Sequence, residues 1–122
     1  MSLKIDYSEE NNYLIRKFNG ILEPNDIISA WKYLIEEKLK KKKYIGVISD
    51  YTNVKLDMEL DDFDHLLDLF KKNSKLLENI KLAMVLETHI NEVFPLLTLR
   101  YSQFNIRSFP TFESAKNWVL EL

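Results

Sequence analysis

Acidic side chains cluster between residues 57 and 68, and their spacing is the first place where chemistry could be read from this chain. Four of them occupy positions one, three, five and twelve of a calcium-binding loop: Asp57, Glu59, Asp61 and Asp68. Such a loop needs glycine at position six, where this chain has Asp62, and Leu60 and Phe63 continue a helical apolar spacing through the segment. We therefore interpret the acids as residues that stabilise the start of a helix.

Asp61, His65 and Asp68 would lie within one narrow sector of that helix, as metal ligands do. The sector is nearly opposite the apolar stripe of the same helix, formed by Leu60, Phe63, Leu67 and Phe70. Ligands without cover or supporting hydrogen bonds bind metals weakly. We predict a solvated face here and no metal site.

Polar residues also follow two apolar runs, "YIGVIS" (44–49) and "KLAMVLE" (81–87), that are typical of buried parallel strands. Ligands and partners of such sheets gather beyond the carboxyl ends of the strands. The sequence thus predicts a functional rim formed by Asp50, Tyr51, Thr52, Asn53, Asp57, Glu87, Thr88 and His89. Asp50 and His89 could form an acid–base pair in a hydrolase, but no complete catalytic set follows from spacing alone. We predict no catalytic residues.

Composition excludes several other classes of function. The chain has no cysteine and only two glycines, which excludes thiol chemistry and glycine-rich phosphate loops, and we expect no cofactor. Its net charge is −2, and the lysine run 38–43 has no interleaved aromatic residue, so we expect no nucleic acid partner. The amino terminus lacks a signal-peptide pattern, and no apolar run is long enough to span a membrane, so we expect a cytoplasmic protein.

The elements that must position these residues alternate along one domain, residues 1–122. Strands are predicted at 3–7, 11–22, 44–49, 81–87 and 105–109, and helices at 23–43, 56–77, 88–104 and 110–122. Within them Tyr13, Ile15, Phe18, Trp31 and Trp118 are expected to point inward. The order ββαβαβαβα predicts an α/β fold with a mixed five-stranded sheet, an antiparallel hairpin first and parallel strands after it. Thr88 and Thr111 are expected to cap the last two helices.

Three stretches together resemble one family. They are "YLIRKFNGILEPNDIISAWKYLI", "YIGVISDYTNVKLDMELDDF" and "FPTFESAKNWVL", and they look like the SpoIIAA-like, STAS-type domains of bacteria. The resemblance implies a small domain that makes regulated protein contacts. In anti-anti-sigma members, the turn before the second helix carries Asp-Ser, and the serine is phosphorylated. Here Asp57 matches the aspartate, but Met58 stands in place of the serine, and the nearest hydroxyls are Ser49 and Thr52.

Three functions follow as hypotheses. The first is a non-enzymatic interaction or regulatory module without a serine switch, with another protein or a second copy of itself as partner. The second is a carrier or sensor of a small apolar ligand, held between the sheet and the helix that contains Pro95. The third, and least favoured, is a hydrolase that uses Asp50 and His89.

Overall fold

The computed structural model describes residues 3–56, 60–86 and 101–121 of the chain. A single five-stranded sheet runs through these residues, with the strands side by side in chain order: β1 (Lys4–Glu10), β2 (Tyr13–Leu22), β3 (Gly46–Leu56), β4 (Lys81–Val85) and β5 (Ile106–Phe109). β1 and β2 are antiparallel, and every later pair is parallel. The predicted mixed sheet with a leading hairpin is confirmed.

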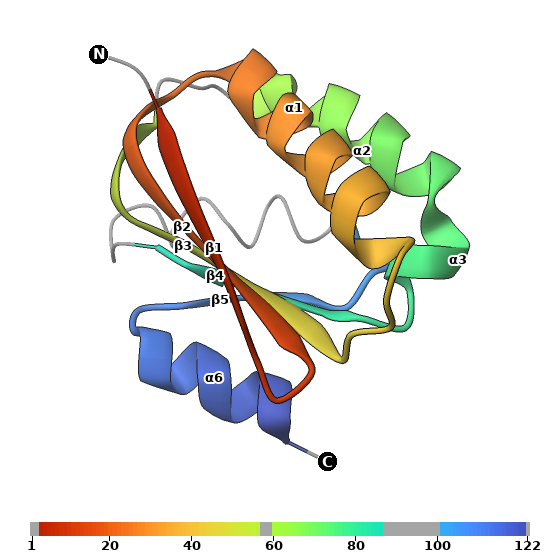
Figure 1. Ribbon diagram of the computed structural model, residues 1–122. Helices are drawn as coiled ribbons and strands as arrows, with labels where there is room; N and C mark the ends of the chain where they lie inside the picture. The colour runs from red at the N-terminus through yellow and green to blue at the C-terminus, as the bar shows by residue number, and fades with distance from the viewer. Residues whose placement is uncertain (1–2, 57–59, 87–100, 122) are drawn as a thin grey trace.

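Helices cover both faces of the sheet (Figure 1). The first helical layer begins with α1 (Pro24–Leu34), which continues as a π-helical turn (Ile35–Leu39). The same layer also contains a 3-10 turn (Leu60–Asp62), α2 (Phe63–Lys72) and α3 (Ser74–Leu77). The opposite face carries α6 (Phe112–Leu120). The predicted helix at 88–104, including Thr88 as its cap, lies outside the described residues.

Local sequence explains where several elements begin and end. Asn11 and Asn12 both have positive φ, which asparagine tolerates better than most residues and which a tight hairpin turn requires. Glu23 and Asp26 form a reciprocal capping box at the start of α1. Thr111 Oγ1 accepts a hydrogen bond from the Ser114 backbone N–H at 3.2 Å, which confirms the predicted cap of α6.

Two predicted boundaries were wrong. The strand expected at 44–49 instead runs from Gly46 to Leu56. Leu56, which was expected to open the next helix, is therefore the last residue of that strand, and the helical segment is described from Leu60 onward. That helix also breaks at Asn73, whose side-chain amide donates to the Leu69 carbonyl at 3.0 Å and competes with the helical hydrogen bonds. β3 extends further than expected because β2 offers it a partner strand along its whole length.

The sheet separates two hydrophobic clusters. The larger one lies beneath α1 and α2 and contains Trp31 and Phe70, and the smaller one lies beneath α6 and contains Trp118. Because both faces of β2 are covered, its residues alternate between the clusters: Tyr13 and Ile15 pack toward α6, whereas Phe18 packs toward α1. The prediction that these three point inward is confirmed, although they point into two different cores.

A cluster of polar side chains connects the end of β1 to the loop before β3. The Tyr44 hydroxyl and the Glu9 carboxylate share a hydrogen bond, and Lys42 Nζ lies 3.0 Å from Glu9 Oε2. The hydrogen bond to Glu9, together with burial, raises the pKa of Tyr44 to about 12. The hydrogen bonds from Tyr44 and Lys42 lower the pKa of Glu9.

We expect this cluster to lose its stabilising effect in alkaline solution. The pKa of Tyr44 is raised from 10.0 to about 12, so its contribution is complete below pH 10 and is lost as the pH rises through about 12. Thermal unfolding from pH 9 to 12 should therefore show a steeper loss in the wild type than in Tyr44→Phe, which lacks the ionisable hydroxyl. Parallel curves for the two proteins would contradict this assignment.

Candidate functional site

Four of the predicted rim residues lie in the outer half of β3, beyond the end of its neighbour β4. Asp50 pairs with Val85, the last residue of β4, and β3 then continues beside β2 alone. Asp50, Tyr51, Thr52 and Asn53 were expected in a turn after the strand, and that expectation was wrong. They nevertheless lie at the carboxyl end of the parallel sheet, where the rim was predicted.

An irregularity in β3 determines how these side chains point. Lys17 pairs with Asp50 and Asn19 with Asn53, so β3 has one residue more than β2 between the two pairs. Such a β-bulge bends the strand and changes the direction in which its side chains point. Asp50 Oδ1 stabilises the bulge by accepting hydrogen bonds from the Thr52 N–H at 3.0 Å and the Thr52 hydroxyl at 2.8 Å.

The residues around the bulge differ in how far they are exposed to solvent. Tyr51 is buried and stacks on Phe18, with ring centroids 4.6 Å apart. Thr52 is half-buried, and Asn53 is exposed. Tyr51 is therefore a core residue, and Thr52 and Asn53 are the members of the rim that a partner could contact.

The other four predicted rim residues, Asp57, Glu87, Thr88 and His89, lie outside the described residues. The Asp50–His89 acid–base pair and the pocket beside Pro95 are therefore untested. For Asp50 itself, the two hydrogen bonds from Thr52 give its carboxylate a structural role.

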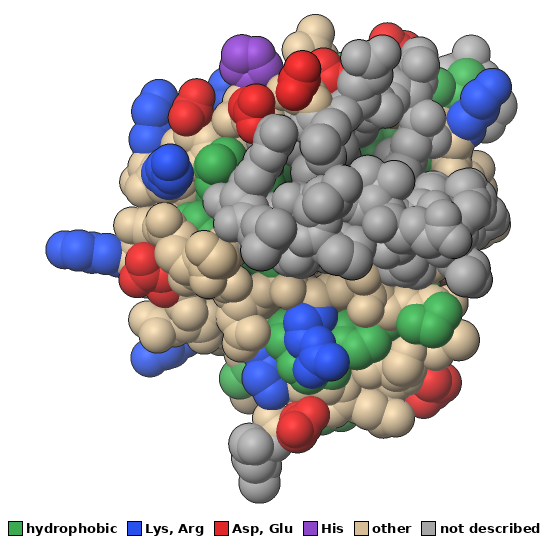
Figure 2. Space-filling view, turned by 180° about the vertical axis from the view of Figure 1, so that it is seen from behind, with side chains coloured by type: hydrophobic (Ala, Val, Ile, Leu, Met, Phe, Trp, Pro, Cys, Tyr) green, Lys and Arg blue, Asp and Glu red, His purple; other side chains and the backbone are tan. Residues whose placement is uncertain are grey.

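Two of the three charged patterns considered in the sequence lie at the solvated surface, and Asp57 and Glu59 of the calcium-loop pattern lie outside the described residues. Asp61, His65 and Asp68 are all exposed, and no group of metal-ligating side chains occurs within residues 3–56, 60–86 and 101–121. Figure 2 shows acidic side chains and a histidine standing at the surface at one end of the molecule. In the lysine run, Lys40, Lys41 and Lys42 each pair with a glutamate at 2.8, 3.5 and 3.0 Å.

A buried arginine, whose burial the sequence did not predict, lies next to the rim residue Tyr51. Arg16 on β2 is 0 % exposed. Its Nε donates to Ser49 Oγ at 2.6 Å, and its Nη2 is 3.5 Å from the Tyr51 hydroxyl. The guanidinium carbon lies 4.2 Å from the centroid of the Trp31 ring, a cation–π stacking distance.

The cross-strand neighbour of Arg16 is Tyr7 on β1. Burial raises the pKa of Tyr7, and the nearby Arg16 guanidinium opposes that rise. These interactions of the guanidinium are with hydroxyl groups and aromatic rings. The alternation of Leu14, Arg16 and Phe18 is the signal that could have placed this arginine inside, because residues two apart on a strand share a face.

Comparison with known proteins supports the fold assignment. No protein-family model and no curated protein sequence matches the chain. Among solved structures, an anti-sigma factor antagonist from Mycobacterium paratuberculosis matches with a TM-score of 0.65 and 16 % identity, over 97 % of this chain and 94 % of that one. An uncharacterised protein from Shewanella loihica PV-4 with a SpoIIAA-like fold matches with a TM-score of 0.61 and 16 % identity, over 96 % and 93 %.

The anti-sigma factor antagonist SpoIIAA in its unphosphorylated form also matches, with a TM-score of 0.61 and 11 % identity, over 99 % of this chain and 100 % of that one. No helix within the described residues is both long and apolar enough to cross a membrane. The matches cover each chain almost completely, so the likeness extends to the whole arrangement of elements. The chain therefore has a SpoIIAA-like fold.

Proposed function

We propose that this protein is a non-catalytic, cytoplasmic regulatory module that works by binding another protein. The observation that carries the proposal is that the fold matches, over nearly the whole length of both chains, two proteins described as anti-sigma factor antagonists.

The contact surface in this proposal is the outer half of β3, from Thr52 to Lys55. Asn53 and Lys55 are exposed there, and Ile21 on β2 pairs with Lys55 and is 36 % exposed. An apolar side chain beside polar and charged ones is the mixture found in regulatory protein interfaces. The β-bulge holds these side chains on a rigid sheet, which lowers the entropy lost on binding.

The proposed module works without a serine switch. Met58 occupies the position at which the family resemblance would place the phosphorylated serine. The nearest hydroxyls before it are engaged: Ser49 is 2 % exposed and accepts from Arg16, and Thr52 donates to Asp50. A phosphate on Thr52 would also lie against the Asp50 carboxylate and be repelled by it. Regulation would then depend on the amount of partner or of this protein.

Site-specific photo-crosslinking in the source cells tests the proposed surface. A benzophenone amino acid at Asn53 is expected to yield a covalent adduct with one protein partner. The matched control is Asn117, an exposed asparagine on α6 that lies outside the proposed surface, which should give no such adduct. Intact-mass measurement of the purified protein should show no phosphorylated species. The same adducts from both positions, or none from Asn53, would remove the basis for this interface.

A further inference from the structure

β1 forms one edge of the sheet, and within the described part of the chain its only strand partner is β2. The two strands pair in a regular register over the seven residues of β1, which contains no proline. The strand at the other edge, β5, has four residues. Short strands, prolines and bulges protect exposed edges, because unpaired backbone groups can pair with another chain. β1 has none of these three protections.

The hairpin turn determines which backbone groups of β1 lie at the open edge. Residues 11–12 form a two-residue turn with positive φ, so Glu10 and Tyr13 on either side of it form a hydrogen-bonded pair. Hydrogen-bonded and non-hydrogen-bonded pairs alternate along antiparallel strands. The residues of the non-hydrogen-bonded pairs therefore direct their backbone N–H and C=O groups away from β2. At the start of the strand these residues are Leu3, Ile5 and Tyr7.

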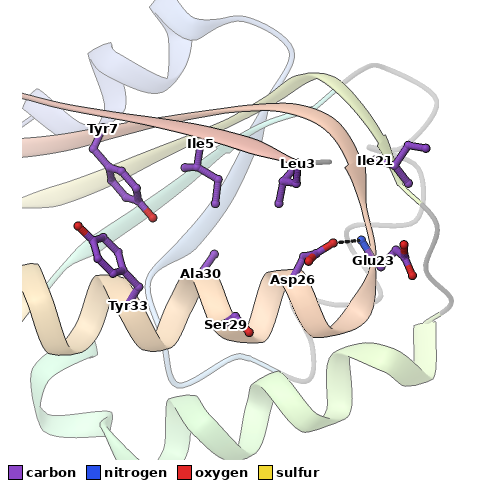
Figure 3. A pocket seen from close by; sticks show the side chains of 9 residues that line it. All are labelled: Leu3, Ile5, Tyr7, Ile21, Glu23, Asp26, Ser29, Ala30 and Tyr33. Atoms are coloured by element: carbon purple, nitrogen blue, oxygen red, sulfur yellow. Dashed lines mark hydrogen bonds between the residues drawn. The ribbon is translucent and has the colours of Figure 1, made fainter. Parts of the chain in front are cut away.

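The same three residues carry the apolar side chains of the edge. They are half-buried, and they line a groove of about 570 Å³ between β1 and α1. Ala30 and Tyr33 of α1 stand across the groove from them, and Tyr33 is 45 % exposed (Figure 3). An apolar strip beside a free backbone edge is a surface that an added strand with alternating apolar residues can cover.

The sequence of β1 is complementary to itself in one antiparallel register. When a two-fold axis passes through Ile5, this residue faces its own copy and Leu3 faces Tyr7 of the second chain. On the other face of the sheet, the exposed Lys4 then faces the exposed Asp6 of the second chain, and the symmetry repeats this pair. Apolar side chains thus meet apolar ones, and opposite charges meet, which is the pairing that stabilises antiparallel strands.

The neighbouring registers bring unfavourable pairs together. With the axis at Asp6, that carboxylate faces its own copy, and like charges directly opposite each other are destabilising. With the axis at Tyr7, Ile5 faces Glu9, whose carboxylate is already bound by Lys42. Charged residues on an edge strand usually discourage pairing, but here their order selects the register centred on Ile5.

The groove side of α1 is arranged with the same symmetry. Figure 3 shows Tyr33 beside Tyr7 and Asp26 nearer to Leu3, with Ile5 between the two ends. A two-fold axis at Ile5 therefore brings Tyr33 of one chain toward Asp26 of the other. A phenolic hydroxyl donates hydrogen bonds and a carboxylate accepts them, so this second pair is also complementary.

We propose that this protein forms a symmetric dimer in which β1 pairs with β1 of a second copy, antiparallel and centred on Ile5. The two sheets then join into one continuous sheet, and the two grooves close over a shared apolar core between the α1 helices. Such an interface uses the same patch on both copies, as is usual for two-fold dimers. The proposal does not depend on the partner-binding surface at Thr52–Lys55, and either can fail without the other.

Single cysteines test the register, because the chain has no cysteine of its own. Ile5→Cys places two thiols at the axis, where the Cα atoms of a hydrogen-bonded pair are about 5.5 Å apart, within the range for a disulfide. Mild oxidation should therefore give a disulfide-linked dimer. Ser8→Cys is the control: Ser8 is more exposed than Ile5, but in this register it lies about 20 Å from its own copy and should cross-link only by collision.

Sedimentation velocity over a range of protein concentrations measures the dimer itself. Lys4→Asp replaces two attractive pairs by two repulsive ones and should raise the dimer dissociation constant about tenfold. Asp6→Lys should have the same effect, and the double variant, which restores opposite charges, should regain the wild-type constant. Lys72→Asp makes the same charge change at an exposed position of α2, which lines no part of the groove, and should leave the constant unchanged.

The charge variants alter exposed residues only, so they keep the test valid if Ile5→Cys does not fold. A protein that stays monomeric at every concentration would overturn the proposal and leave the edge to a strand of a different protein. Equal cross-linking of Ile5→Cys and Ser8→Cys would also overturn it. The same holds if the double charge variant dissociates as readily as the two single ones.

Discussion

Replacing Phe70 with alanine is expected to lower the free energy of unfolding by about 3–5 kcal/mol. Phe70 is 0 % exposed and lies at the centre of an aromatic cluster. Its ring makes edge contacts with Trp31, Tyr101 and Phe104, with centroids 4.7, 5.3 and 5.2 Å away. These partners come from α1 and from the segment before β5, so the truncation would open a cavity where three parts of the chain meet.

Urea denaturation followed by circular dichroism would measure this loss. Leu67→Ala is a suitable control, because Leu67 is on the same helix but only half-buried, and it should cost less than half as much. A domain of this size has a total free energy of unfolding of about 5–15 kcal/mol. The Phe70→Ala variant is therefore expected either to keep a measurable free energy of unfolding or to be unfolded without urea. Phe70→Leu keeps most of the volume and provides an intermediate value. Equal losses for Phe70→Ala and Leu67→Ala would show that the aromatic cluster is not central to stability.

Replacing Ser49 with alanine is expected to lower the free energy of unfolding by about 1.5–3 kcal/mol, the range for a hydrogen bond to a charged group. The Ser49 hydroxyl accepts from Arg16 Nε at 2.6 Å in a site from which water is excluded. Alanine would leave the buried guanidinium with one more unsatisfied donor. The cost should therefore depend on the presence of the charge.

A double-mutant cycle measures that dependence. In an Arg16→Met background, which removes the buried charge and keeps an unbranched apolar side chain, Ser49→Ala should be nearly neutral. The expected coupling energy is about 1–3 kcal/mol, as for residues in direct contact. Ser8→Ala, at an exposed position of β1, is the control and should be neutral in both backgrounds. Additive effects of the Arg16 and Ser49 changes would contradict the assigned contact.

The architecture was predictable because its signals are local and repeated. Alternation of apolar runs with amphipathic stretches predicted the order of strands and helices, and that order requires parallel pairing after the first hairpin. Capping by Thr111 and the exposure of Asp61, His65 and Asp68 were predictable for the same reason. Each depends on residues within one or two turns of a helix, and neighbouring parts of the chain do not alter it.

The interior of the proposed sites was not predictable in this way. The extension of β3 through Asp50–Asn53 depends on β2, whose sequence lies more than 30 residues earlier. The burial of Tyr51 follows from a bulge that no local pattern marks. The burial of Arg16 was not predicted, because a charged residue in a strand is normally exposed. Only the helices that cover both faces of the sheet make this side chain inaccessible to water.

By itself, then, the sequence determined an α/β fold with one mixed sheet, the order of the described strands and helices, and an absence of cysteine chemistry. Those properties follow from composition and short-range periodicity. Only the tertiary structure decided that Ser49 accepts a hydrogen bond from a buried arginine, that Tyr51 belongs to the core, and that Arg16 stacks on Trp31. These depend on contacts between distant strands and helices, and burial, which sets the energetic value of each polar group, exists only once those elements have packed together.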